Sequence, residues 1–188
     1  FIDEQGVGDA MARSLASNHC DVVCVSAGET FSRVDDQRFI ISPGRREHYD
    51  QLVGALKNSR RLPAQIVHLW SVTREAPYQA STERFARYQQ RGFYSLLYLV
   101  QALSVAQVSD PLQLTIATNQ VRDVSGQELL CPDKATVLGP AMTIGVEFPQ
   151  ITCRTVDVWL ADHEDVSTQA ENLLREAAAA SSDKQVAY

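Results

Sequence analysis

Hydrophobic residues gather in short runs along this chain, and longer amphipathic stretches separate the runs. The runs that predict strands are "DVVCV" (21–25), "AQIVHLW" (64–70), "LQLTIAT" (112–118) and "TCRTVDVW" (152–159). The first three are almost continuously apolar, which is typical of strands that are covered on both faces. The fourth run alternates between apolar and polar residues, which favours a strand at the edge of the sheet. Phe1 and Ile2 are interpreted as the end of a first strand, and "KQVAY" (184–188) as the beginning of a last one.

The stretches between these runs carry apolar residues at helical spacing. They predict helices over residues 7–18, 46–59, 92–106, 132–148 and 165–181. Residues 92–106 are apolar nearly all round, which predicts a buried helix. Pro132 suits the first turn of its helix, whereas Gly139-Pro140 predicts a kink or an interruption.

Strands that alternate with helices predict βαβ units and a mostly parallel sheet covered on both faces. The expected fold is therefore an α/β, Rossmann-type layout. Two long connections interrupt the alternation. Residues 26–46 form an excursion with a short extended run, "RFIIS", which predicts a small hairpin, and residues 71–91 form a second, polar connection.

Composition and charge exclude several classes of function and partner. The net charge of −6 argues against nucleic acid or an anionic membrane surface as a partner. Two arginine pairs, at residues 45–46 and 60–61, are interpreted as solvated loops. No apolar run approaches the roughly 20 residues of a membrane span, and no signal peptide is recognisable. The cysteines lack metal-site spacing, and Cys20 and Cys153 beside apolar runs predict buried free thiols in a reducing cytosol.

The segment Gly6-Val7-Gly8 has the outline of a dinucleotide-binding turn. Such a turn needs a third glycine for close packing of helix against strand, and Met11 occupies that position. Asp3 and Glu4 directly precede the turn, where their carboxylates would repel phosphates. We therefore interpret the glycines as a requirement of turn geometry, with a phosphate site as the alternative.

Candidate catalytic residues are few. A short-chain reductase needs a tyrosine with a lysine four residues later, and none of the tyrosines is followed in this way. His68 lies within an apolar strand and is interpreted as a core histidine bonded to neighbouring backbone. Asn119 follows a predicted strand, where α/β enzymes often place a polar active-site group, although a turn or a helix cap explains it as well. The sequence predicts no catalytic, cofactor-binding or metal-ligating residue.

Several segments resemble a known family in their order and spacing. They are "FIDEQGVGDAMA", "IVHLW", "GFYSLL", "PDKATVLGP" and "FPQITCRTVDV". They resemble the structural, non-catalytic subdomain of the ketoreductase in modular type I polyketide synthases, which is related to the pseudo-ketoreductase of animal fatty acid synthase. The resemblance covers essentially the whole chain.

The resemblance implies that residues 1–188 form a single subdomain with a truncated short-chain-dehydrogenase fold, in which residues 26–46 are an excursion. It implies that this chain is not an enzyme, binds no cofactor and packs on a catalytic subdomain expected after residue 188. That catalytic subdomain binds NADPH and reduces β-ketoacyl groups on acyl carrier protein. The implied parent is a cytoplasmic, multifunctional polyketide synthase that also carries out acyltransferase-type chain extension. Its dehydratase, methyltransferase or enoylreductase domains would be further partners.

Two alternatives stay open. The chain could be a self-sufficient NADPH-dependent short-chain reductase, or an independent module that binds a small ligand in the strand-end crevice near Asn119.

Overall fold

The computed structural model describes residues 1–74, 81–126, 128–160, 166–179 and 183–187. One group of strands has the order β1-β3-β2 and the other has the order β4-β5-β6-β7. The strands are β1 (Cys24–Ala27), β2 (Ser32–Arg33), β3 (Arg38–Ile41), β4 (Gln65–Ser71), β5 (Leu112–Thr118), β6 (Ile151–Asp157) and β7 (Gln185–Ala187). Among the neighbouring strands that pair, β2 and β3 are antiparallel and the other pairs are parallel.

Phe1 and Ile2 join the two groups of strands into one sheet. The Ile2 nitrogen donates to the Val25 carbonyl of β1 at 3.0 Å. On the other side, the Phe1 nitrogen donates to the Val67 carbonyl of β4 at 2.9 Å, and the Leu69 nitrogen donates to the Phe1 carbonyl at 2.9 Å. The predicted end of a first strand thus lies in the middle of the sheet, between β1 and β4.

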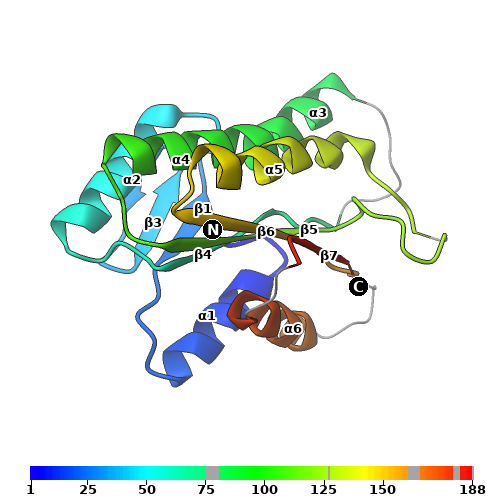
Figure 1. The fold of residues 1–188 in the computed structure, drawn as a ribbon, viewed down its shortest axis with the longest axis horizontal. Coiled ribbons are helices and arrows are strands. Elements are labelled where there is room, and N and C mark those ends of the chain that lie inside the picture. The colour runs from blue at the N-terminus through cyan, green and yellow to red at the C-terminus, as the bar shows by residue number, and fades with distance from the viewer. Residues whose placement is uncertain (75–80, 127, 161–165, 180–182, 188) are drawn as a thin grey trace.

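Helices form a layer on each face of the sheet (Figure 1). One face carries α2 (Arg46–Asn58), α4 (Ser95–Val105) and α5 (Leu138–Glu147), and the other carries α1 (Val7–Ser17) and α6 (Val166–Ala178). Two apolar cores lie between the layers. The larger core includes Phe39, Leu52, Leu96, Leu114 and Ile116, and the smaller includes Val7, Met11, Leu69, Val156 and Leu173. The expected three-layer α/β arrangement, with strands covered on both faces, is confirmed.

The long connection at residues 71–91 contains a helix that the sequence analysis missed. Helix α3 (Thr82–Gln89) begins after Ser81, whose hydroxyl accepts from the Arg84 nitrogen at 3.4 Å. It continues without a break into a π-turn, η1 (Gln90–Tyr94), and then into α4. Helix α3 is short and polar, and Tyr88 is its one buried residue, so its apolar periodicity is too weak to predict a helix. Residues 75–80 of this connection lie outside the described part of the chain.

The excursion at residues 26–46 is only partly a hairpin. Strands β2 and β3 pair in antiparallel fashion, as predicted. However, β3 also pairs in parallel with β1, from Cys24 opposite Arg38 to Ala27 opposite Ile41, so it is a strand of the main sheet. Strand β1 itself begins at Cys24, three residues later than the apolar run at 21–25 predicted.

The prediction that residues 152–159 form an edge strand is wrong. Strand β6 lies between β5 and β7, and the alternating pattern has another cause. The polar member Arg154 is buried and forms an ion pair with Glu176 of α6. Its guanidinium also donates to the Glu176 carbonyl at 2.9 Å. A paired arginine can therefore occupy a buried strand position that an alternating pattern assigns to solvent.

Two further expectations need correction. Cys20 is exposed, because α1 ends at Ser17 and β1 begins only at Cys24, so this cysteine lies in the connecting loop. Cys153 is buried as predicted, and burial raises the pKa of its thiol to about 12. The helix at 132–148 changes from a 3-10 turn, η2 (Pro132–Val137), to α-helix at Leu138, so the interruption precedes Gly139-Pro140.

The buried Arg154–Glu176 pair predicts a large effect on stability. Arg154→Ala is expected to lower the free energy of unfolding by about 3 kcal/mol, because it takes one partner out of a buried ion pair. Urea unfolding followed by circular dichroism measures the change. Arg33→Ala is the matched control, because the Arg33–Asp36 pair is solvent-exposed, and it should cost less than about 0.5 kcal/mol. Equal losses in the two variants would contradict the buried role of Arg154.

Candidate functional site

The carboxyl ends of the strands are where a ligand site is expected in this topology. The chain order reverses between residues 1–2 and β4, and ligands of open α/β sheets bind outside the strand ends at such a reversal. Two adjoining cavities lie there, of about 500 Å³ and about 150 Å³. Both are lined by Ala27 and Arg91. We call them together the strand-end crevice.

The glycine turn beside this crevice is closed by the chain's own carboxylate. The side chain of Asp3 is buried and accepts from the backbone nitrogens of Gln5 at 2.7 Å, Val7 at 3.3 Å and Gly8 at 2.6 Å. These nitrogens belong to the N-terminal end of α1, where a dinucleotide-binding turn holds pyrophosphate. Asp3 thus occupies the place that a phosphate would need.

Each glycine of the turn has a geometric role. Gly6 has a φ of 92°, in the left-handed region that favours glycine. At Gly8, an added Cβ would lie 2.8 Å from the Ile2 Cβ and 2.9 Å from the Ile2 Cα. Helix α1 therefore approaches the first strand so closely that only glycine fits. This packing gives the glycines a role that does not depend on a phosphate.

An ion pair links the turn to the long helix. Glu4 pairs with Arg91 of the π-turn, and the hydrogen bond from Arg91 holds the pKa of the Glu4 carboxyl below its usual value. Arg91 also lines both cavities of the strand-end crevice. A π-turn within a helix often marks a functional position.

Asn119 is used to hold two segments together. Its amide oxygen accepts from the Thr73 nitrogen at 3.0 Å, and its amide nitrogen donates to the Thr73 carbonyl at 2.7 Å. The ammonium of Lys134 donates to the same amide oxygen at 2.7 Å. Asn119 lies in the bend that follows β5 and is a buried bridge between the end of β4, the end of β5 and η2.

Lys134 also lies over the ring of Tyr88, with its nitrogen 5.5 Å from the ring centroid. A search for tyrosine followed by lysine four residues later cannot find this pair, because the two residues are far apart in sequence. The ammonium faces the ring, whereas the phenol oxygen accepts from the Arg84 side chain at 3.4 Å. This contact is a cation–π interaction that joins α3 to η2.

Asp157, at the end of β6, was not singled out in the sequence. Its carboxylate accepts from the Thr118 hydroxyl at 2.6 Å and from the nitrogens of Val121 at 3.1 Å and Arg122 at 2.8 Å. It therefore fixes the loop that follows β5. An aspartate in an apolar run was the available signal.

His68 is a buried core histidine, as expected, but its partner differs from the expectation. Its Nε2 lies 3.0 Å from the hydroxyl of Ser95 in α4, which is a side chain rather than backbone. Burial holds the pKa of His68 well below its usual value, so the imidazole is neutral. His19 is exposed and His48 is half-buried, while His163, Tyr78 and Tyr188 lie outside the described residues. His68 therefore serves packing between sheet and helix.

Among the described residues, no cluster of three or more His, Cys, Asp or Glu could hold a metal ion. None of the helices that the structure describes is long and apolar enough to cross a membrane.

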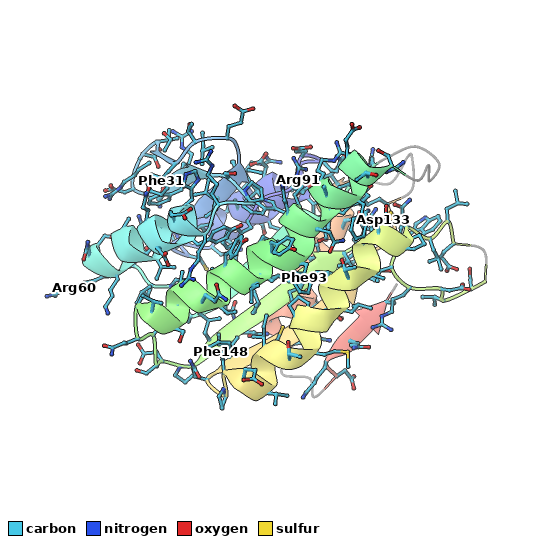
Figure 2. The ribbon with its side chains drawn as sticks, turned by 90° about the horizontal axis from the view of Figure 1, so that it is seen from above. Phe31, Arg60, Arg91, Phe93, Asp133 and Phe148 are labelled. Atoms are coloured by element: carbon cyan, nitrogen blue, oxygen red, sulfur yellow. The ribbon has the colours of Figure 1, made fainter. Side chains whose placement is uncertain are left out.

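A second candidate surface lies on the outer side of α4 and α5. These helices contain one charged residue between them, Glu147, although both reach the surface. Tyr94, the last residue of η1 directly before α4, is 42% exposed, and Met142 and Val146 of α5 are 65% and 71% exposed. Phe93 packs beside the start of α5, within 3.9 Å of where a Cβ on Gly139 would lie (Figure 2). We call this surface the α4–α5 face.

The lack of charge on this face is unusual for a surface helix. Such a helix normally carries charged residues opposite its apolar stripe. Helix α2, on the same side of the sheet, does so with Arg46, Glu47, Asp50 and Lys57. Exposed apolar residues on helices that nearly lack charge make this surface a candidate for an interaction site.

The geometry thus defines an α/β protein with a Rossmann-type sheet. The Asp3 carboxylate occupies the nitrogens of its glycine turn, and its α4–α5 face is apolar. The profile of the family described as beta-ketoacyl synthase-like, N-terminal, matches residues 3–178. The chain belongs to this family. No curated protein sequence matches it significantly.

Solved structures share the fold. A keto acid-selecting NRPS module with adenylation, ketoreductase and pseudo Asub domains is 23% identical, with a TM-score of 0.85 over 100% of this chain and 15% of that chain. An N-terminal ketoreductase from the macrolactin assembly line is 18% identical, with a TM-score of 0.79 over 99% of this chain and 36% of that one. The chain therefore spans well under half the length of these two proteins.

Short-chain dehydrogenases match as well. An oxidoreductase of this family from Brucella ovis, in complex with a partially ordered NAD, is 12% identical, with a TM-score of 0.68 over 96% of this chain and 93% of that chain. The predicted short-chain-dehydrogenase-like fold is confirmed, and so is the predicted resemblance.

The close contact at Gly8 can be tested by substitution. Gly8→Ala is expected to lower the free energy of unfolding by about 1–3 kcal/mol, because the new Cβ meets the backbone of Ile2. Gly54→Ala is the matched control, because Gly54 lies in α2 with nothing within 4 Å of its added Cβ. It should stabilise the protein by about 0.5–1 kcal/mol. A Gly8 variant as stable as the parent would show that the close packing is absent.

Burial of His68 predicts a pH dependence of stability. The folded-state pKa lies well below the usual 6.5 of the unfolded chain, so below that pH the unfolded state binds a proton that the folded state does not. The free energy of unfolding should therefore fall with decreasing pH below 6.5, by at most about 1.4 kcal/mol per pH unit from this residue. Urea titrations at several pH values measure the slope. His68→Gln should reduce it, and His19→Gln, at an exposed site, should leave it unchanged.

Proposed function

We propose that this chain is the non-catalytic structural subdomain of a ketoreductase in a polyketide-synthase-type assembly line. It acts by packing on an NADPH-binding catalytic half that follows it in the same polypeptide. The observation that carries the proposal is the α4–α5 face, where Tyr94, Met142 and Val146 are exposed and where α4 and α5 contain one charged residue between them. In this proposal residues 1–188 form one unit, and reduction of β-ketoacyl groups on acyl carrier protein belongs to the catalytic half.

The comparisons support this choice of partner. The NRPS module and the macrolactin assembly-line protein each contain a ketoreductase, and their chains extend far beyond the part that this chain matches. A unit of this fold in such proteins therefore has further chain to pack against. An apolar helix face gains stability from such packing, by about 25 cal/mol for each Å² removed from water.

The turn at Asp3 supports a role without cofactor or catalysis. Its carboxylate takes the nitrogens of Gln5, Val7 and Gly8, so a pyrophosphate would have to displace it. The sequence also lacks the tyrosine–lysine spacing of a short-chain reductase. We therefore assign NADPH to the partner half and no reacting group to this chain.

Packing can affect catalysis without contributing a reacting group. A rigid neighbour limits motion around a cofactor cleft and holds reacting groups in place, and small misplacements are costly in rate. In the same proposal the subdomain spaces neighbouring dehydratase, methyltransferase or enoylreductase domains in a cytoplasmic, multifunctional synthase.

The experiment places charge on the α4–α5 face. Met142→Glu with Val146→Glu, in the polypeptide that includes the catalytic half, should lower the melting temperature of that half and its ketoreductase activity. Two carboxylates would be buried at an apolar interface, which is costly. Both positions are exposed in this chain, so its own fold should survive, as circular dichroism of residues 1–188 can verify.

Val34→Glu is the matched control, since Val34 is 50% exposed and follows β2 at the other edge of the sheet. It should leave stability and activity unchanged. The proposal fails if the catalytic half alone is as stable and as active as it is together with this chain.

The effect of NADPH on the melting temperature distinguishes the proposed structural role from that of a self-sufficient reductase. A chain that binds NADPH should be stabilised by about 2.7 kcal/mol at a cofactor concentration one hundred times the dissociation constant. We expect no shift in the melting temperature of the 188-residue chain with NADPH. A clear upward shift, together with turnover by this chain alone, would replace the structural role by a catalytic one.

A further inference from the structure

The loop that joins β5 to η2 exposes large apolar side chains at the carboxyl end of the sheet. We call residues 119–131 the β5–η2 loop, and the structure describes all of it except residue 127. Val124 is 60% exposed, Leu129 is 71% exposed and Leu130 is 40% exposed. Surface loops are usually polar, and such exposed side chains add little to the core of this chain. A partner that covers them would remove this apolar surface from water.

The β5–η2 loop is held in shape by its own hydrogen bonds. At its base, the Cys131 nitrogen donates to the Gln120 carbonyl at 2.8 Å, so the two ends of the loop lie side by side. At its tip, the Glu128 carboxylate accepts from the nitrogens of Ser125 at 2.9 Å and Gly126 at 3.1 Å. Compact loops with paired ends are frequently functional. A loop that already has a fixed shape also loses little conformational entropy when a partner packs on it.

The same loop is bonded to the end of β7. The side chain of Arg122 donates to the side chain of Gln185. Asp157, whose carboxylate accepts from the nitrogens of Val121 and Arg122, lies opposite Ala187 in the pairing of β6 with β7. Since β7 is parallel to β6, both strands end at the edge of the sheet where this loop lies (Figure 1). A chain that continues from β7 therefore leaves the sheet beside the β5–η2 loop.

We infer that the β5–η2 loop is a docking surface for the stretch of polypeptide that directly follows residue 188. In this arrangement an apolar part of that stretch covers Val124, Leu129 and Leu130. The inference rests on the proposed function, in which a catalytic half follows this chain.

The docked stretch would have a definite role in the assembly. A connection that packs on the loop leaves β7 in one direction, whereas a free connection samples many directions. The loop thereby limits the orientations in which the catalytic half reaches the α4–α5 face. Fewer orientations raise the effective concentration of the catalytic half at that face.

Hydrogen exchange tests the inference in the polypeptide that contains the catalytic half, with the 188-residue chain as the reference. The backbone amides of Leu129 and Leu130 should exchange at least about tenfold more slowly in the longer polypeptide, because a packed segment must move away before they exchange. The amides of β2, at the other edge of the sheet, should exchange at the same rate in both proteins.

Side-chain variants locate the contact. Val124→Ser with Leu129→Ser, in the longer polypeptide, should return the exchange of Leu130 to the rate of the 188-residue chain, because the covered apolar surface is lost. Both side chains are largely exposed, so the fold should survive, as circular dichroism can verify. Val34→Ser is the matched control, since Val34 is 50% exposed and follows β2, and it should leave the slow exchange unchanged.

A change in the connection identifies what covers the loop. Replacing about ten residues after residue 188 by glycine and serine should abolish the slow exchange, because such a linker is flexible and has no apolar side chains. The inference is overturned if the loop exchanges equally fast in both proteins. It is also overturned if the slow exchange survives the replacement, and a rate that then falls with protein concentration would identify a second copy of the chain as the partner.

The proposed function is tested separately by Met142→Glu with Val146→Glu in the same polypeptide. If that variant loses stability and activity while the loop shows no slow exchange, the proposed function stands and this inference fails. If the loop shows slow exchange while that variant has no effect, the loop contact stands and the α4–α5 face is not the interface.

Discussion

The bond between the Asp3 carboxylate and the N-terminal end of α1 is the constraint on which the site depends. It fixes the turn between the first strand and α1 with three backbone hydrogen bonds, to Gln5, Val7 and Gly8. A Rossmann-type fold usually offers such nitrogens to a phosphate. Here the chain supplies its own anion, covalently attached and therefore always present. The fold keeps its geometry at this turn and uses the nitrogens for its own stability.

The same principle holds along the rest of the carboxyl edge. Asn119, Lys134 and Asp157 are polar groups of the kind that enzymes place at strand ends, and each is bonded to neighbouring backbone or side chains. Buried polar groups of this kind cost stability unless they are paired, so their partners are part of the fold. At the carboxyl ends of β4, β5 and β6, these polar groups are therefore all bonded to other parts of the protein. The strand-end crevice, on the β1 and β3 side, is where arginines face an open cavity.

The two candidate contact surfaces differ in size and in location. The α4–α5 face is apolar and nearly without charge, which suits a protein partner that removes it from water. The β5–η2 loop is smaller and keeps its shape through bonds to Glu128 and Asp157, which suits a short segment of chain. The loop leads through η2 into α5, so both surfaces draw on one continuous stretch of the chain.

The sequence by itself determined the alternation of strands and helices, because apolar periodicity is a local property. The apolar pattern predicted the observed bounds of β5, and it predicted the bounds of α1 and α2 to within one residue. Met11, at the position of the third glycine, argued against a complete dinucleotide-binding turn. Only the tertiary structure decided which strands are neighbours, so β3 joined the main sheet and β6 became internal. It also brought Tyr88 to Lys134 and Asp3 to the start of α1. Contacts of this kind depend on how distant segments pack or on how a turn is shaped, and neither leaves a periodic signal in the chain.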